Sequence, residues 1–307
     1  MAEVITFGEA MVLMYGERGL PLAEATSFTR SVAGAEANVS VGLARLGHDV
    51  AWFGRVGDDP FGRVVLNTLR GEGVDVSRAR VDPDAPTGLL VRDCLAERRI
   101  SVAYYRAGSA GSRLDAADVD HDWIGGAKLL HVTGITAALS ESARQATHAA
   151  VAAAKAAGVP VCLDPNLRFK LASAERWREL IEELAVHADL VLTGDEETSV
   201  IAGEEGERWF FERGAGLVVT KLGARGAKAT DGRSSWEVPV WPVTAVDSVG
   251  AGDAFAAGFL SGWLRELPVP EALRVGARVA AFVVGTPGDQ SGLPYLSEIS
   301  GGADVDR

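Results

Sequence analysis

The segment DSVGAGDAFAAGF, residues 247–259, combines residue types that suit phosphate chemistry. Gly250, Ala251 and Gly252 stand directly before the acid Asp253, and spacing typical of a helix follows. A turn of small residues at a helix start leaves several backbone N–H groups unpaired and unobstructed, and the helix dipole adds partial positive charge there. The segment is therefore predicted to bind an anion.

Asp253 is an unusual residue for such a place, because its negative charge competes with a bound anion. The position makes sense when the anion is a phosphoryl group and the carboxylate takes a proton from the group that attacks it. This combination favours phosphoryl transfer to an alcohol, with Asp253 as base and the backbone of Gly250, Ala251 and Gly252 as anion hole. The plain alternative is a glycine-rich helix start, in which Asp253 is a first-turn acid that the dipole favours.

The sequence lacks the other common phosphate-binding and metal-binding motifs. It has no GxxxxGK[ST] loop and no HRD, and Phe255 stands where GxGxxG has its third glycine. These observations disfavour a P-loop enzyme, a protein kinase and a standard dinucleotide fold. The five histidines show no HxH or HExxH spacing, so a protein metal site is not expected.

The composition disfavours two further classes of partner. The chain has 307 residues and a formal net charge of −12 at pH 7, which opposes broad attraction to nucleic acid or to anionic lipid. No stretch approaches the roughly 20 consecutive apolar residues that a bilayer span requires. The N-terminal MAEVITFGEAMV has no basic segment followed by a long apolar one. We therefore expect a cytoplasmic protein with neither nucleic acid nor a membrane as partner.

The elements that must position the catalytic segment are predicted to be alternating strands and helices. The strand-like runs are almost continuously apolar, which is typical of a parallel sheet covered on both faces. Ser140 and Gly158 have the residue types of an N-cap and of a C-terminal glycine around one helix. The predicted strands span residues 3–8, 49–57, 127–133, 159–164, 188–194 and 216–223. The predicted helices span 36–46, 60–72, 140–157, 174–187, 252–265 and 270–284, and a further helical region is predicted through 195–213.

The predicted fold is α/β: one doubly wound domain over residues 1–307, with a mainly parallel sheet flanked by helices. A predicted hairpin, TGLLVRDCL and ISVAYYR around AERR, interrupts the alternation. We expect a small β lid built from segments within about 12–35 and 86–107. Ligands in such sheets bind beyond the carboxyl ends of the strands, so functional residues are expected just after strands.

The opening segment resembles the DTxGAGDxF signature of the ribokinase-like (PfkB) family of carbohydrate kinases. Ser248 replaces the usual threonine of that signature and keeps the hydroxyl. The string GAEAN at 34–38 is similar to the family's sugar motif, and GRVGDDPFG at 54–62 stands where members carry a similar segment. The resemblance covers nearly the whole chain and implies a ribokinase-like fold.

Within that family, three strings resemble the kinases of 2-keto-3-deoxygluconate. They are YYRAGSAGS at 104–112, HVTGITAALS at 131–140 and LDPNLR at 163–168. The resemblance implies ATP-dependent phosphorylation of a sugar acid at a primary hydroxyl, which gives the 6-phosphate.

A sugar acid needs a cation that grips its carboxylate, and Arg106 and Arg168 are the candidates because a guanidinium matches a carboxylate in two parallel hydrogen bonds. Tyr104 is two residues from Arg106 and would add a hydroxyl from the same strand face. The resemblance implies that Gly34 and Asn38 also contact the sugar acid. The plain alternative is that both arginines are surface charges.

One departure from the family lies on the first strand of the predicted hairpin. Some relatives carry a tyrosine or another polar group there, whereas Leu89, Leu90 and Val91 are apolar. The identity of the sugar is therefore left open within the class.

The nucleotide is predicted to lie near KLGARG, residues 221–226, which resembles the family's glycine-containing ATP segment. Lys221 would reach a phosphate, and Gly223 and Gly226 would let the backbone approach the nucleotide; the alternative is a plain hairpin turn. The resemblance also implies that Asn166 contacts phosphate.

Magnesium is expected as a cofactor together with ATP. Glu197 matches the acid of the family's NxxE motif, which organises Mg²⁺ through water, but Gly194 replaces the asparagine of that motif. A need for a monovalent cation near GTPGDQSG, residues 285–292, stays open.

Two alternatives to this function remain. One is a kinase for another sugar, such as fructose, ribose or 2-keto-gluconate, and the other is a non-catalytic sugar-sensing protein of the same fold. Exposed strand edges on the lid also favour a homo-oligomer, either a dimer or an assembly built from dimers.

Overall fold

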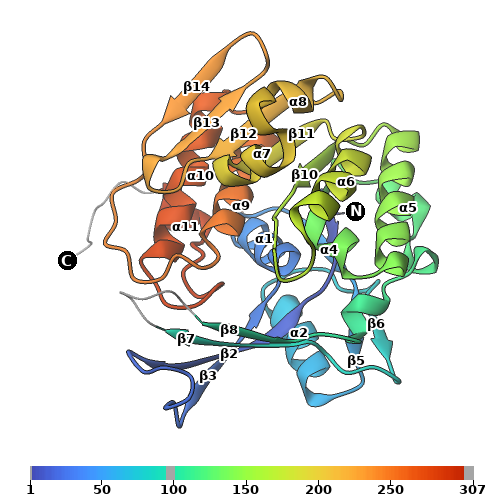
Figure 1. Cartoon of the computed structure of the whole chain (residues 1–307), viewed down its shortest axis with the longest axis vertical. Coiled ribbons are helices and arrows are strands. Elements are labelled where there is room, and N and C mark those ends of the chain that lie inside the picture. Colours follow the sequence, from blue (N-terminus) through green and yellow to red (C-terminus); the bar gives the residue numbers. More distant parts are fainter. Residues whose placement is uncertain (1, 95–100, 301–307) are drawn as a thin grey trace.

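The computed structural model describes residues 2–94 and 101–300, and its centre is a mainly parallel sheet (Figure 1). Over these residues the strand order is β14-β13-β12-β11-β10-β9-β1-β4, and only the pairs β12–β13 and β13–β14 are antiparallel. The doubly wound α/β prediction is confirmed. The strands are β1 (Val4–Phe7), β4 (Val50–Phe53), β9 (Leu129–Thr133), β10 (Val161–Asp164), β11 (Leu190–Gly194), β12 (Leu217–Lys221), β13 (Ala227–Thr230) and β14 (Ser235–Val238).

Helices cover both faces of this sheet (Figure 1). Ser140 Oγ accepts a hydrogen bond from the N–H of Ala143 at the start of α5, and Gly158 ends that helix with φ 74°, as their residue types predict. The longer helices are α1 (Ala35–Arg45), α2 (Pro60–Gly71), α5 (Glu141–Ala157), α6 (Ala174–Ala185), α7 (Asp195–Ala202), α9 (Ala251–Leu264) and α10 (Val269–Val284).

Short helical segments, most of which the sequence pattern does not predict, fill the connections. A helix of one or two turns has too few positions for its periodicity to be distinguished from that of a loop. They are α3 (His121–Gly125), α4 (Gly134–Leu139), α8 (Arg208–Phe211), α11 (Leu296–Ser300), η1 (Ala110–Arg113), η2 (Ala116–Asp118), η3 (Gly203–Glu205) and η4 (Gly223–Arg225).

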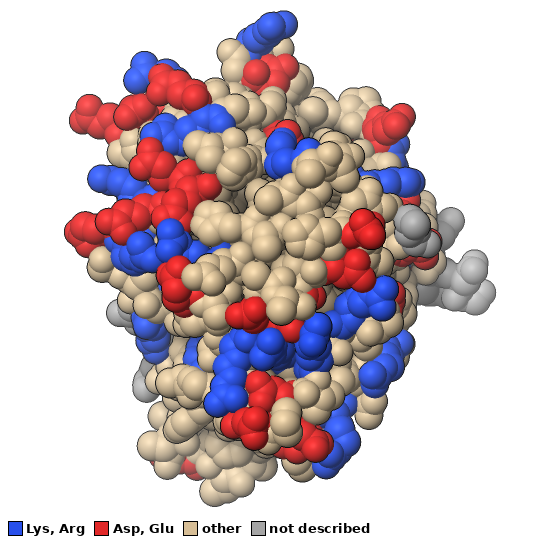
Figure 2. All heavy atoms as spheres, turned by 90° about the vertical axis from the view of Figure 1, so that its right-hand side faces the viewer, with Lys and Arg blue, Asp and Glu red and all other residues tan. Residues whose placement is uncertain are grey.

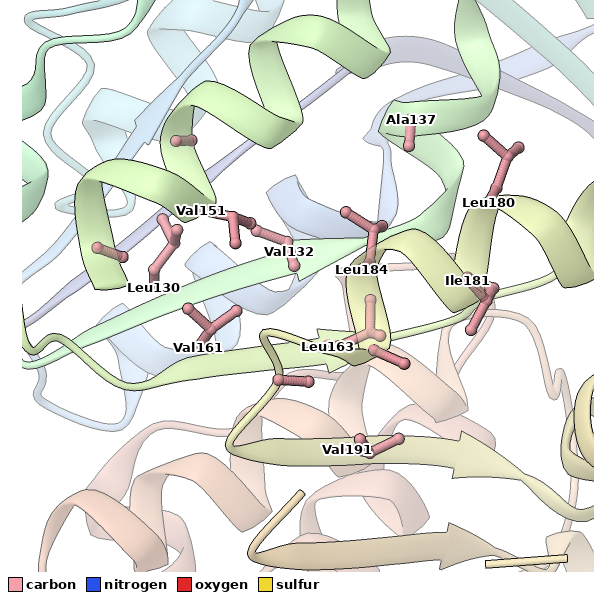
Figure 3. Packing of buried hydrophobic residues seen from close by; sticks show 14 of the residues in the cluster. Leu130, Val132, Ala137, Val151, Val161, Leu163, Leu180, Ile181, Leu184 and Val191 are labelled. Atoms are coloured by element: carbon pink, nitrogen blue, oxygen red, sulfur yellow. The ribbon is translucent and has the colours of Figure 1, made fainter. Parts of the chain in front are cut away.

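The core lies in two layers, one on each face of the sheet. Alternate residues of a strand point to opposite faces. Leu130 therefore packs into the cluster shared with α5 and α6, and Leu129 packs into the cluster shared with α1, α9 and α10. Figure 3 shows the first layer, where side chains of β9 and β10 meet those of α5 and α6. Helix α9, which carries the anion-binding segment, is thus fixed against the sheet.

A second sheet, with order β3-β2-β7-β8, lies below the main sheet in Figure 1. Its strands are β2 (Met11–Arg18), β3 (Phe28–Ala33), β7 (Leu89–Cys94) and β8 (Val102–Tyr105). Strands β7 and β8 pair antiparallel, while the predicted turn AERR, residues 96–99, lies outside the described residues. A separate two-stranded sheet joins β5 (Arg55–Gly57) to β6 (Arg80–Asp82).

The surface carries charges of both signs. Acidic and basic side chains are interspersed over the face in Figure 2. Among the described residues, no helix is long and apolar enough to cross a membrane.

Candidate active site

The anion-binding segment forms the N-terminus of α9. Gly250 is the N-cap residue and has φ 82°, a left-handed conformation that favours glycine. A Cβ atom on Gly250 would also lie 2.8 Å from the carbonyl oxygen of Asp289. The N–H of Ala251 donates to Ser248 O over 3.3 Å, a long contact that a phosphoryl oxygen could replace.

Asp253 lies in the first turn of α9 and is buried. Asn38 Nδ2 donates to its Oδ2 over 2.8 Å, and Asn166 Nδ2 donates to its Oδ1 over 3.3 Å. Burial raises the pKa of Asp253 above its usual range, and the hydrogen bond from Asn38 opposes that rise. The result is a carboxylate that is held in place and accepts a proton more readily than an exposed one.

Lys221, the last residue of β12, supplies a positive charge at the same place. Its Nζ lies 2.7 Å from Asp164 Oδ2 and would lie 3.9 Å from a Cβ atom on Gly252. Burial lowers the pKa of Lys221, but the charge of Asp164 contributes to a net rise, so the ammonium stays protonated. Burial also raises the pKa of Asp164.

A cavity of about 200 Å³ lies between the second sheet and the start of α9. It brings together seven residues that the sequence analysis selected from four separate stretches of the chain. These residues are Gly34, Asn38, Tyr104, Arg106, Arg168, Gly250 and Asp253. The volume suits a small molecule the size of a sugar.

Arg106 and Tyr104 form one wall of this cavity. The Arg106 guanidinium lies 5.6 Å from the centre of the Tyr104 ring and forms an ion pair with the carboxylate of Glu9. Ser109 Oγ donates to the same carboxylate. Arg106 is therefore anchored inside the protein and is not an ordinary surface charge.

Arg168 lies in the loop after β10 and lines the cavity as well. Its Nη1 donates to the carbonyl of Leu167 over 3.1 Å. Its positive charge opposes the rise that burial causes in the pKa of Asp253. Two guanidinium groups thus face the space next to the candidate base.

The predicted nucleotide residues lie on two loops, one after β10 and one after β12. Asn166 has φ 47° and follows β10, and its side chain reaches Asp253. Gly223 and Gly226 lie in the turn after Lys221. A Cβ atom on Gly226 would lie 2.1 Å from the carbonyl oxygen of Val238, which gives this glycine a packing role of its own. Neither glycine lines the cavity described above.

Glu197 lies in the first turn of α7, where it caps two backbone segments. Its Oε1 accepts from the N–H of Leu167 over 2.8 Å, and its Oε2 accepts from the N–H of Gly194 over 2.7 Å. Glu197 therefore fixes the loop that carries Asn166 and Arg168. Among the described residues, no group of three or more His, Cys, Asp or Glu side chains could hold a metal ion by itself.

Sequence reasoning missed several buried charged residues around the cavity. Glu36 Oε1 accepts from the hydroxyls of Thr133 and Thr136, over 2.6 Å each, and burial raises its pKa. Glu9 holds Arg106, as described above. Arg92 lies on β7, two residues after Leu90, and both line the cavity. The period of two along a strand could have placed Arg92 on the cavity face, but nothing in the pattern shows which partner it meets.

Comparison with known proteins identifies the family of the chain. Residues 1–296 match the family described as pfkB family carbohydrate kinase. A 2-dehydro-3-deoxygluconokinase of Bacillus subtilis (strain 168) is 37% identical, with 97% of this chain and 94% of the relative covered. The same enzyme of Thermoproteus tenax is also 37% identical, with 97% and 93% covered.

Solved structures agree as well. A PfkB protein from Polaromonas sp. JS666 is 41% identical and superposes with a TM-score of 0.89, covering 98% of this chain and 100% of that chain. A fructokinase from Vibrio cholerae O395, in fructose-, ADP- and calcium-bound form, is 30% identical with a TM-score of 0.87, and 98% of each chain is covered.

The fold, the buried carboxylate at a helix start and these similarities define a sugar kinase. The chain belongs to the PfkB family of carbohydrate kinases, as the resemblance of residues 247–259 implies.

Proposed function

We propose that this kinase transfers the γ-phosphoryl group of ATP to the 6-hydroxyl of 2-keto-3-deoxygluconate, which is also called 2-dehydro-3-deoxygluconate. The observation that carries the proposal is that Arg106 and Arg168 line the same cavity as Asp253. A carboxylate held by the two guanidinium groups would turn the other end of the sugar towards the base. The names of the two relatives at 37% identity support the same substrate.

Asp253 would accept the proton of the sugar hydroxyl as that oxygen attacks the γ-phosphorus. The new bond joins phosphorus to the sugar oxygen, the bond to the bridging oxygen of ATP breaks, and ADP leaves. Asn38 and Asn166 orient the carboxylate, and the N–H groups at the start of α9 would stabilise the charge on the moving phosphoryl group. Lys221 lies close enough to Gly252 to add a positive charge there.

Mg²⁺ fits this site as a companion of the nucleotide. Asp164 Oδ1 and Asn166 Oδ1 are buried and have no hydrogen-bond partner among the described residues. Oxygen atoms of this kind suit the water molecules around Mg²⁺, with Glu197 as a further water-mediated contact. When bound, the ion would neutralise the charge of the nucleotide phosphates.

A monovalent cation near residues 285–292 stays a proposal. Asp247 and Asp289 bring two buried carboxylates there, and Arg92 pairs with both. Turnover in K⁺ compared with tetramethylammonium tests the proposal, because only the first ion is small enough to enter such a site.

The first test is ADP production from ATP and Mg²⁺ with 2-keto-3-deoxygluconate, its galactonate epimer, 2-keto-gluconate, fructose and ribose. We expect turnover with the keto-deoxy acids, and a loss of about 10²- to 10⁴-fold in Asp253→Asn with sugar binding retained. Turnover only with neutral sugars would support the kinase activity and contradict the binding of a sugar carboxylate by Arg106 and Arg168. Binding of a sugar without turnover would favour the sugar-sensing protein.

Another sugar is the nearest alternative, because the related fructokinase has fructose bound and Leu90 gives this cavity an apolar side chain. Arg106→Met distinguishes the two. It should raise the KM for keto-deoxy acids by at least tenfold if Arg106 holds a carboxylate, and leave a neutral-sugar kinase little changed. Arg113→Met, at a half-exposed arginine paired with Asp82, is the matched control.

We also propose that the second sheet acts as a lid and pairs with that of a second subunit to form a homodimer. Strands β3 and β8 are the edges of this sheet, and Tyr105 on β8 is 66% exposed. Open strand edges and exposed aromatic side chains suit an interface between copies. Analytical ultracentrifugation of the protein and of Tyr105→Asp tests this, with monomer at all concentrations as the contrary result.

A cytoplasmic location is the last part of the proposal. It rests on the choice of ATP as phosphoryl donor. Cell fractionation followed by a turnover assay tests it.

A further inference from the structure

Arg92 is a fully buried arginine on β7, in the middle of the second sheet. It is opposite Tyr15 of β2 on one side and opposite Val102 of β8 on the other. Its guanidinium lies 5.6 Å from the centre of the Tyr15 ring. Buried arginines are rare unless they are paired, so the partners of this one indicate its role.

Two carboxylates of the main domain, which is the part of the protein built around the mainly parallel sheet, pair with Arg92. Its Nη2 lies 2.6 Å from Asp247 Oδ2 and 3.3 Å from Asp289 Oδ1. Both acids are buried. Burial raises the pKa of Asp289, the charge of Arg92 opposes that rise, and the resulting pKa is about 6. Without Arg92, two buried like charges would face each other across loops that are 42 residues apart in the chain (289 minus 247).

Asp247 and Asp289 both make contacts next to the anion-binding turn. Asp247 Oδ1 accepts from the N–H of Val249 over 3.1 Å, and its Oδ2 accepts from the N–H of Gly288 over 3.2 Å. The carbonyl oxygen of Asp289 packs against Gly250, where it leaves no room for a Cβ atom. The position of the first residue of the turn therefore depends on the two loops that Arg92 joins.

The loop that contains Asp289 is also connected to the base Asp253, through Gln290 and Asn38. Gln290 Nε2 donates to Asn38 Oδ1 over 3.0 Å, and Asn38 Nδ2 donates to Asp253 Oδ2 over 2.8 Å. The bond from Gln290 fixes the orientation of the Asn38 amide, because it leaves the nitrogen facing Asp253. A displacement of residues 289–290 would thus move the anion-binding turn and the donor to the base together.

We propose that Arg92 is a positioning residue for phosphoryl transfer: it holds the loops of Asp247 and Asp289 together and completes the anion-binding turn only when β7 lies against the main domain. This proposal rests on the proposed kinase function and deepens it. It gives the second sheet a direct connection to the reacting groups, in addition to any role in covering the sugar.

The experiment compares Arg92→Met and Arg92→Lys with Arg30→Met, a control at an exposed arginine of β3 in the same sheet. Turnover is measured with whichever sugar the wild-type protein phosphorylates fastest. We expect kcat to fall about 10²-fold in Arg92→Met, comparable to the loss of one anion-hole donor, with the KM for the sugar changed less than threefold. Arg92→Lys should retain more kcat than Arg92→Met, because lysine keeps the positive charge but lacks the planar guanidinium that donates to two carboxylates.

A second variant is needed because Arg92→Met deprives two buried acids of their arginine partner and can destabilise the fold. Asp289→Asn keeps the ion pair between Arg92 and Asp247 and removes the negative charge of the second pair. We expect kcat to fall about tenfold in that variant with the KM for the sugar unchanged. Amide hydrogen exchange should also be faster at Val249 and Gly288 in both variants, and this readout does not require turnover.

A rise in the KM for the sugar with kcat unchanged would make Arg92 a substrate contact and overturn the proposal. Equal effects in Arg92→Met and Arg30→Met, or unchanged exchange at residues 247–254 and 286–290, would overturn it too. Absence of turnover in the wild-type protein would remove the proposed kinase function, while the exchange measurement would still report on the connection between Arg92 and the turn.

Discussion

The environment of Asp253 determines how it can act as a base. Burial disfavours its charged form, whereas the amide donors Asn38 and Asn166 favour it. The balance leaves the pKa above 3.8, the ordinary value for this carboxyl. With its pKa raised in this way, Asp253 accepts a proton more readily than a free aspartate does.

Replacement of Asn38 should therefore change the pH dependence of the reaction. Asn38→Ala removes a hydrogen bond that stabilises the ionised carboxylate, so the pKa of Asp253 rises further. Activity that needs the ionised form is lost as pH falls through that pKa, and the acid limb of kcat/KM should move to higher pH. Asn67→Ala, at an exposed asparagine on α2, is the control. An acid limb at the same pH in both variants would contradict the assignment of Asp253 as base.

At the scale of elements, the start of α9 depends on a contact that only glycine permits. Gly250 combines a left-handed backbone with the close approach of Asp289 O, at 2.8 Å from the position of a Cβ atom. Gly232, in the turn between β13 and β14, has the same φ of 82° but an open environment, with its nearest contact at 3.8 Å. The two glycines separate the effect of backbone conformation from that of packing.

Gly250→Ala should cost more than Gly232→Ala. Each change places a Cβ atom in a left-handed residue, which costs about 1–2 kcal/mol of stability. In Gly250→Ala the collision with Asp289 adds to that cost and displaces the anion-binding turn, so kcat should also fall at least tenfold. Urea unfolding and turnover measure both effects. Equal losses of stability, with kcat unchanged in both variants, would show that the close approach has no role.

At the scale of the whole molecule, the second sheet contacts the main domain at the cavity. Lys170, in the loop after β10, donates from Nζ to the carbonyl of Val102 over 2.6 Å and so ties the edge strand β8 to that loop. Closure of such a sheet over the sugar would exclude water and suppress hydrolysis of ATP.

Hydrogen exchange tests this closure. Sugar should slow the exchange of amides in β2, β7 and β8, and Lys170→Met should reduce that protection at residues 102–105, because one tie to the main domain is lost. Lys155→Met, which removes an ion pair with Asp189 outside the cavity, is the control. Equal protection of the second sheet with and without sugar would show that it does not act as a lid.

The sequence by itself determined the features that depend on neighbours along the chain. The anion-binding segment is contiguous from Gly250 to Asp253, and the helix caps at Ser140 and Gly158 depend on residues within one turn. The alternation of apolar strands and helices determined the α/β class, because the periods of two and 3.6 are local properties. Residues 104–106 and 163–168 could be selected because they follow strands and resemble family strings.

The tertiary structure alone decided which charges are buried together. Arg92 is 155 residues from Asp247 and 197 residues from Asp289, and Glu9 is nearly 100 residues from Arg106. No local pattern shows such a pair, because the burial and the partner of a charged side chain depend on how remote segments pack against each other. The sequence therefore supplied the chemistry of the site, and the packing of the second sheet on the main domain supplied the arrangement of its charges.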